Sequence, residues 1–455
     1  MSATAAIKKH DVDMTEGSIV RHIIYFALPL LAGNIFQQLY NTVDTWVVGN
    51  YVSNEAFSAV GTTAPIINML IGFFTGLANG AGVVISQNYG ARRYDKMQDA
   101  IHTTLFMTII LGVVFTALGI FITPVMLSLM KVPPEVLPEA TEYLTIYFAG
   151  IFGLMIYNVG AAILRAVGDS RRPFMFLVVS AVTNTVLDLV FVLVLKMGVE
   201  GVAYATIIAQ GISAVLVIIS LLKNDSAVRF YPSKLKIHLD ILKKIINVGL
   251  PAAFQMAITA FSNVFVQSYI NYFGADCMSG WTAFHKIDQL MFLPIQSVAL
   301  ASTTFVGQNL GSGKVDRAKK GILYSVLISM LTIIVILAPI LMLAPQITAF
   351  FNSKAEVVVY GAQFLRIIAP FHIFGCINQV LAGALRGAGK SRVPMVIMIV
   401  SFVLFRQTYL FITANFISNT FVPIAIGYPA GWIVCSIITL IYYKLTPLAS
   451  EKIVD

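Results

Sequence analysis

The residues of this sequence best suited to chemistry form a polar stripe in an apolar segment. The stripe consists of Asn34, Gln37, Asn41 and Asp44, whose spacing of three or four positions puts them on one face of a helix. A charge at the centre of a bilayer costs about 2.5 kcal/mol or more, so Asp44 indicates an ion or substrate path. The alternative is that the stripe joins neighbouring helices. Pro29 comes about one turn earlier and is expected to bend the helix as a hinge.

A second polar pair lies in another apolar segment. Asn184 and Asp188 are four positions apart, so they stack on one side of a helix. An amide oxygen and a carboxylate in this arrangement form half of an oxygen cage for a monovalent cation, or a hydrogen-bonded proton carrier. Asn158 and Thr206, in neighbouring segments, are candidates for further oxygens. The alternative for each residue is an ordinary packing role.

A third group of charged residues lies in the second half of the chain. Asp288 is close in sequence to His285 and Lys286, so it either lines a cavity or neutralises Lys286. Three further basic residues are compatible with helix-to-helix contacts or with substrate binding. They are Arg366, His372 and Arg406.

These side chains must be positioned by membrane-spanning helices. Hydrophobic residues make up 58% of the chain and charged residues only 11%, whereas soluble proteins carry about 25% charged residues. Apolar stretches long enough to cross a bilayer recur along the whole chain. The twelve predicted spans are residues 19–43, 56–85, 101–122, 139–164, 173–195, 199–222, 241–271, 278–307, 320–342, 357–384, 394–414 and 421–443. The predicted fold class is therefore an all-α integral membrane protein.

An internal duplication divides these spans into two halves. Residues 164–173 and 385–394 share the pattern Leu-Arg-x-x-Gly-x-Ser-Arg-x-Pro, and residues 87–90 and 308–311 share Gln-Asn-x-Gly at the same offset. An even number of spans in each half predicts two six-helix lobes with the same topology, related by a pseudo-two-fold axis along the membrane normal. The predicted parts are a cytoplasmic segment (1–18), an N-lobe (19–222), a linker (223–240), a C-lobe (241–443) and a tail (444–455).

The basic residues predict the orientation. They follow the even-numbered spans, whereas the opposite loops hold only Lys131, Lys196 and Lys354. By the positive-inside rule, both termini are expected in the cytoplasm. The net charge of +9 is then an orientation signal, and we expect no nucleic-acid partner.

The candidate ion ligands occur in only one half. At the repeat offsets, Asp44 corresponds to Val266, and Asn184 and Asp188 correspond to Phe405 and Tyr409. We therefore expect a coupling-ion site in the N-lobe alone.

Together, these motifs resemble those of the multidrug and toxic compound extrusion (MATE) family over residues 15–445. In the DinF-like branch, the resemblance implies an N-lobe cation site at Asp44, Asn184, Asp188 and Thr206, with Gln37, Tyr40 and Asn158 as further cavity positions. The NorM-like branch places acids on helices 7 and 10, and residues 255–267 and 375–384 contain none. The resemblance implies export of cationic, amphipathic compounds in exchange for H⁺ or Na⁺.

Other functions make different demands on the sequence. A flippase for lipid-linked headgroups requires a basic cavity, for which Lys286, Arg366 and Arg406 are candidates. An enzyme is not expected, because no HExxH, GxSxG or Walker sequence is present. Without a Walker motif, uphill transport must draw on an ion gradient. We expect two rocking lobes around a central cavity, in a cell-membrane protein that is monomeric and has no cofactor and no metal apart from Na⁺.

Overall fold

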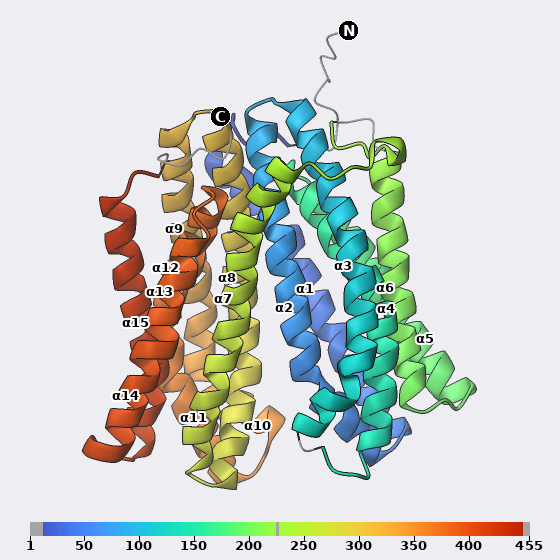
Figure 1. The fold of residues 1–455 in the computed structure, drawn as a ribbon. Coiled ribbons are helices and arrows are strands. Elements are labelled where there is room, and N and C mark those ends of the chain that lie inside the picture. The colour runs from blue at the N-terminus through green and yellow to red at the C-terminus, as the bar shows by residue number, and fades with distance from the viewer. Residues whose placement is uncertain (1–11, 131, 224–226, 449–455) are drawn as a thin grey trace. The chain divides into compact units, whose positions relative to one another are not determined.

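The computed structural model describes residues 12–130, 132–223 and 227–448, of which the side chains of 260, 261 and 264 are left aside. The described residues are 87% helical and contain no strand (Figure 1). Twelve helical segments within these residues are long and apolar enough to cross a membrane, which confirms the predicted number of spans. Lys131 and parts of the predicted N-terminal segment and tail lie outside the described residues.

The helices extend past the apolar spans at several ends. The helix α1 (Ile19–Tyr51) continues well beyond residue 43, and α2 (Asn54–Gly90) begins only three positions later. The polar residues at the helix ends still form helical backbone hydrogen bonds, so the helices are longer than the apolar spans. Hydropathy identifies only the part of each helix that lies within the hydrocarbon core. The remaining helices of the first half are α3 (Tyr94–Leu129), α4 (Leu137–Ala166), α5 (Arg171–Leu189) and α6 (Val199–Leu222).

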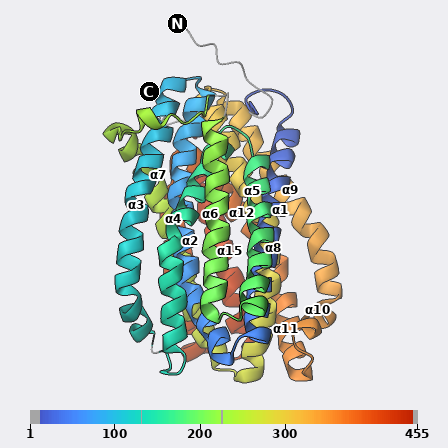
Figure 2. The same ribbon diagram turned by 90° about the vertical axis from the view of Figure 1, so that its right-hand side faces the viewer.

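The first compact unit contains Val12, Asp13 and residues Leu28–Gly249. In it, α4 packs against α2, α3 and α6, and α5 packs against α6 (Figure 2). The apolar core of this bundle is aromatic and aliphatic, with Phe74, Leu144, Phe148 and Ile151 almost fully buried. This packing places α4, α5 and α6 side by side.

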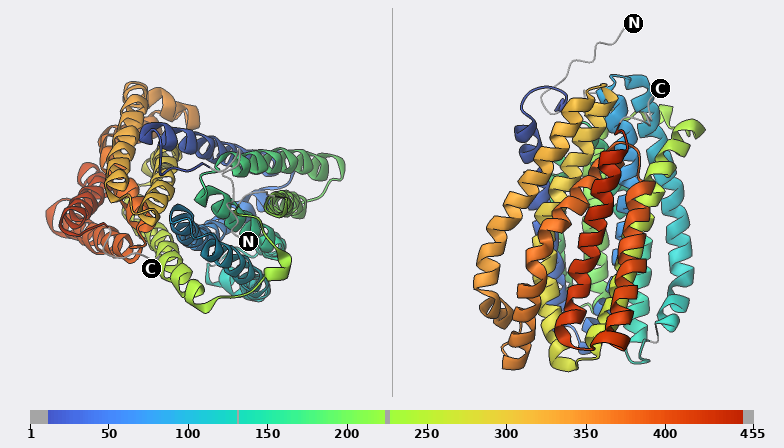
Figure 3. Two further views of the ribbon diagram at one scale, coloured as in Figure 1. Left: turned by 90° about the horizontal axis from the view of Figure 1, so that it is seen from above. Right: turned by 90° about the vertical axis from the view of Figure 1, so that its left-hand side faces the viewer.

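The second compact unit contains Met14–Ala27 and the described residues from Leu250 onward. Here α8 (Ala275–Gly311) packs against α9 (Val315–Met342), α11 (Ala355–Ile368) and α12 (His372–Gly387), and α15 (Phe421–Leu445) packs against α12 (Figure 3). The other helices are α7 (Leu239–Asn271), α10 (Ala344–Phe351), α13 (Arg392–Met398) and α14 (Arg406–Ile412). Trp281, Phe284, Phe364 and Trp432 form the centre of the core.

Two helices change unit at equivalent places in the repeat. The chain passes between units at Ala27–Leu28 in α1 and at Gly249–Leu250 in α7. Pro29 and Pro251 come directly after these positions. Because proline removes an intrahelical hydrogen bond, each helix is weakest where its packing partners change.

The helices next to the candidate residues are locally irregular. A π-helical segment, η1 (Val190–Val194), directly follows α5, and two more, η4 (Ile399–Phe405) and η5 (Thr413–Ile417), flank α14. A 3₁₀ turn, η3 (Ala369–Phe371), contains Pro370 and separates α11 from α12. Such interruptions re-aim side chains and are frequent at functional sites.

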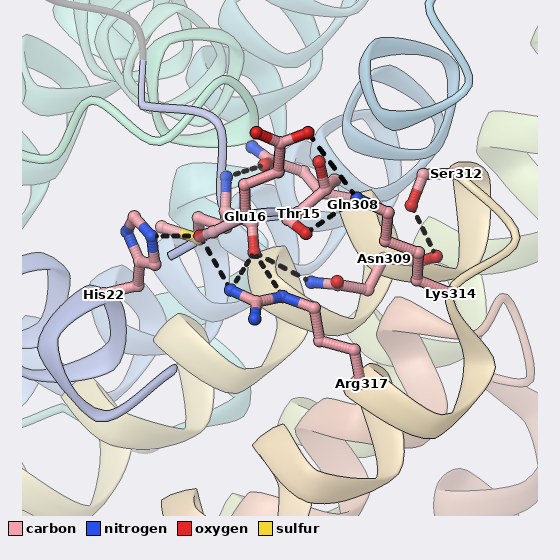
Figure 4. Close-up of polar contacts among 9 residues, drawn as sticks. Thr15, Glu16, His22, Gln308, Asn309, Ser312, Lys314 and Arg317 are labelled. Carbon is pink, nitrogen blue, oxygen red and sulfur yellow. Dashed lines mark hydrogen bonds and ion pairs between the residues drawn. The ribbon is translucent and has the colours of Figure 1, made fainter. Parts of the chain in front are cut away.

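The N-terminal segment before α1 is attached to the second unit. Gln308 accepts a hydrogen bond from the Met14 backbone N–H (2.9 Å), and Asn309 donates to the Met14 carbonyl (3.3 Å). Arg317 donates to the carbonyls of Met14 and Glu16 (Figure 4). The second Gln-Asn-x-Gly motif is thus an anchor for the chain that enters α1.

Candidate site in the first unit

Asp44 of α1 and Asp188 of α5 bring their carboxyl groups within hydrogen-bonding reach of each other. Both are buried, with 8% and 0% of their surface exposed. Within the described part of the chain, no donor reaches Oδ1 of Asp44 or either oxygen of Asp188. A carboxylate can only accept hydrogen bonds, so two facing carboxylates need a proton or a cation between them.

Asn184 adds further unpartnered groups to this site. It lies one turn before Asp188 on α5 and is 1% exposed. Neither its side-chain oxygen nor its side-chain nitrogen has a hydrogen-bond partner among the described residues. Buried polar groups are almost always paired, so a group of them without partners indicates a ligand site.

Thr206 lies on the helix that packs against α5. Ser180 of α5 donates a hydrogen bond to the Ala209 carbonyl of α6 (2.8 Å) and so joins the two helices. Ser180 lies one turn before Asn184, and Ala209 lies about one turn after Thr206. The Thr206 hydroxyl donates to the Val202 carbonyl (3.0 Å) and is 7% exposed. Its oxygen therefore retains lone pairs for a cation.

Only some of the polar residues of α1 lie near Asp188. Tyr40 and Gln37 form a side-chain hydrogen bond with each other, and the Tyr40 ring lies close enough to interact electrostatically with Asp44. Asn41 is exposed and offers only its backbone carbonyl, to Thr45 (2.9 Å).

Asn158 contacts a different helix. It donates to the Leu154 carbonyl (2.9 Å) and accepts a bond from Thr75 of α2 (3.5 Å). These contacts tie α2 to α4, and none of them reaches Asp44 or Asp188.

Two tyrosines near the acids were not anticipated from the sequence. Tyr143 of α4 interacts electrostatically with both Asp44 and Asp188, and Tyr147 forms a side-chain hydrogen bond with Gln210 of α6. Both rings are buried, at 6% and 2% exposed. The sequence signal that could have identified them is the spacing of Tyr143 and Tyr147, which puts two hydroxyl groups one turn apart in an apolar span.

The second unit has no equivalent of these acids at the repeat positions. Val266 is 1% exposed and belongs to the apolar core. Tyr409 donates its hydroxyl proton to the Pro423 carbonyl (3.0 Å), and Phe405 ends the π-helical segment η4.

Asp288 has a partner other than the nearby lysine. Its Oδ1 lies 3.0 Å from Nε2 of His372, while Lys286 is exposed. Arg406 is 1% exposed and donates to Ser262 (2.7 Å) and Asn263 (2.9 Å).

The two acids face each other in a buried position, and the Asn184 amide lies one turn from Asp188 on α5. Oxygen ligands of this kind suit a hard monovalent cation, and the facing carboxyls suit a shared proton. Binding either one removes the repulsion between Asp44 and Asp188, and a positively charged organic group would do the same.

Comparison with known proteins agrees with the duplication. The MatE family model matches residues 29–190 and again residues 251–409. The "Probable multidrug resistance protein YpnP" of Bacillus subtilis is 29% identical over 95% of this chain and 96% of its own length. The "Probable multidrug resistance protein NorM" of Thermotoga maritima is 26% identical over 93% and 92%.

A solved structure has a similar fold over nearly the whole chain. It is described as the outward-facing conformation of a multidrug resistance MATE family transporter. The TM-score is 0.90, with 25% identity over 96% of this chain and 98% of that one.

Proposed function

Because this chain belongs to the MATE family of multidrug efflux transporters, whose members are not enzymes, we propose that it exports cationic amphipathic compounds in exchange for H⁺ or Na⁺. The observation that supports this most directly is the pair of facing carboxyls of Asp44 and Asp188, in which no donor from the described residues reaches either oxygen of Asp188. We place the protein in the cytoplasmic membrane as a monomer with both termini in the cytoplasm, and in the DinF-like branch of the family.

Exchange follows from charge balance at the two acids. With the coupling ion bound, the repulsion between the carboxylates is relieved and a cationic drug gains little by approaching. With the drug bound, the ion is displaced for the same reason. Mutually exclusive binding of ion and drug is the thermodynamic requirement for antiport.

Movement of two lobes around a central cavity would carry this exchange across the membrane, with Pro29 as the hinge. In support, α1 changes packing partners directly before Pro29 and carries Asp44 further along the same helix. Bending at Pro29 would thus change the direction of the part of α1 that carries Asp44 relative to the turns before the proline.

A flippase is less well supported. A pyrophosphate headgroup requires free basic side chains. Arg406 is instead bonded to Ser262 and Asn263 and lies over the rings of Phe402 and Tyr428.

The proposal is tested with everted membrane vesicles and a fluorescent cation. We expect uptake under an imposed pH gradient or an imposed Na⁺ gradient, and none without either. Asp188→Asn should reduce uptake to that of membranes lacking the protein, whereas Asp316→Asn, an exposed acid at the start of α9, should retain it. Full gradient-driven uptake by Asp188→Asn would refute the assignment.

A further inference from the structure

The contact between Asp288 and His372 is the most buried acid–base contact in the described part of the second unit. The carboxylate oxygen and ring nitrogen are 3.0 Å apart, and the two side chains are 6% and 0% exposed. Neither atom has a hydrogen-bond partner in the described residues, so the contact is one between charges. This pair is separate from the acids of the first unit, and the exchange described above does not use it.

The other ring nitrogen determines the protonation of this pair. Nδ1 of His372 lies 3.0 Å from the carbonyl oxygen of Ala369, which can only accept. Nδ1 therefore carries a proton. Nε2 of a neutral ring with this tautomer has a lone pair, and it faces an oxygen that also has only lone pairs unless it is protonated. At 3.0 Å a bare carboxylate and a ring lone pair repel each other, so the pair is stable when it carries one more proton, which makes the contact an ion pair.

That proton sits in a site closed by aromatic rings. The rings of Phe292 and Trp432 each lie 5.0 Å from the His372 ring, centroid to centroid. With the proton, the pair is neutral overall, whether it is written as imidazolium and carboxylate or as imidazole and carboxylic acid. Without it, the pair keeps a buried negative charge against a lone pair, which is unfavourable in a dry site.

The surrounding charged groups do not replace this proton. On α8 itself, His285 interacts with Asp288 and stacks on Trp281, and Lys286 is exposed. Tyr428 of α15 interacts electrostatically with Asp288 and lies beneath the guanidinium of Arg406, 4.9 Å from its ring centre.

On the other helices that pack against α8, the charged side chains are exposed or lie near a helix end. Arg366 on α11 is exposed. The charged residues of α9 all lie in its first two turns, and α10 has none.

We propose that Asp288 and His372 form a second proton-binding site, located in the second unit. Its proton holds α8 against the break at Ala369–Phe371, where Pro370 leaves the helix easiest to bend. When the proton leaves, Nδ1–H stays on the Ala369 carbonyl, the carboxylate is left bare, and the contact opens. Proton binding and the packing of α8 against α12 are thereby coupled.

Proton counting on the purified full-length protein tests this site. In weakly buffered detergent solution, we expect Asp288→Asn to release about one proton fewer per chain than wild type on titration from about pH 6 to alkaline pH, above the range in which surface carboxyls titrate. The asparagine amide can still donate to Nε2, so the helix contact is preserved without the carboxyl group. The matched control is Asp276→Asn on the same helix, which removes a surface carboxyl paired with Lys354 (2.6 Å) and should release as many protons as wild type over this pH range.

Nitrogen NMR of ¹⁵N-histidine-labelled protein supplies a second readout. The His372 signal is identified by its loss in His372→Gln. We expect Nδ1 to stay protonated throughout, and Nε2 to lose its proton at lower pH in Asp288→Asn than in wild type, because the carboxylate that stabilises the imidazolium is gone. Identical titration in both proteins, or an unprotonated Nδ1, would overturn the proposal.

The same measurements separate this site from the first-unit site. In a chain carrying Asp44→Asn and Asp188→Asn, the His372 titration should persist. Its loss in that background would mean that the pair is not an independent proton site.

Discussion

Asp44 and Asp188 belong to helices far apart in the sequence, yet their carboxyl groups lie within hydrogen-bonding reach, and no donor among the described residues reaches either oxygen of Asp188. Neither side chain alone would identify an ion site. Their contact does, because facing carboxyls require a proton or a cation to be stable.

Drug binding should weaken as the pH falls. Protons compete with the cationic drug for Asp44 and Asp188, so its dissociation constant should rise by up to about tenfold per pH unit where the carboxyls titrate. Fluorescence anisotropy on purified protein measures this. In the double variant Asp44→Asn, Asp188→Asn, binding should be weaker and independent of pH between the same limits. Tighter binding at acid pH in wild type would contradict proton competition.

The anchor of the N-terminal segment should depend on Arg317. Its guanidinium donates to the backbone carbonyls of Met14 and Glu16, and hydrogen bonds from charged donors contribute about 2 kcal/mol each. Arg317→Ala should therefore accelerate cleavage after Glu16 by a glutamate-specific protease. The neighbouring exposed Lys319 provides the control, since Lys319→Ala should be cut like wild type. Equal cleavage of both variants would mean that the bonds to Arg317 are not what protects this segment.

Gly80 should tolerate no side chain. A Cβ there would lie 2.3 Å from the Cα of Gly249 and 2.9 Å from the Ile245 carbonyl oxygen, both rigid backbone atoms of the same unit. Gly80→Ala should lower the melting temperature in detergent, as overpacking typically costs about 1–3 kcal/mol. On the same helix, Gly61 has open space around its Cβ position, so Gly61→Ala should be neutral or stabilising. A melting temperature unchanged by Gly80→Ala would show that α2 and α7 can separate without loss.

The membrane orientation can be tested with single cysteines in a cysteine-free background. Cysteines at Lys96, Lys236 and Lys319 should be labelled by an impermeant reagent only from the cytoplasmic side, and cysteines at Asn54, Glu135 and Lys354 only from outside. All six positions are exposed. Labelling of Lys236 and Lys354 from the same side would contradict twelve spans with both termini in the cytoplasm.

The sequence alone determined the fold class and the repeat. Span number depends on apolar length, which is a local property, and the duplicated motifs at 164–173 and 385–394 are visible without any structure. Asp44 and Asp188 were also identifiable from sequence, because a carboxylate in an apolar span is rare and costly.

Only the tertiary structure decided which of these side chains meet. Helical spacing specifies a face but not the neighbour that the face packs against. From the sequence, Asn41 and Asn158 were therefore as good candidates for the site as Asn184. Proximity along the chain favoured Lys286 as the partner of Asp288, whereas packing of α8 against α12 supplied His372. Long-range packing also decides where α1 and α7 pass from one unit to the other, next to their prolines. The close approach of Gly80 to Gly249, for example, holds the first part of α7 in the first unit, and helical spacing alone does not predict such a contact.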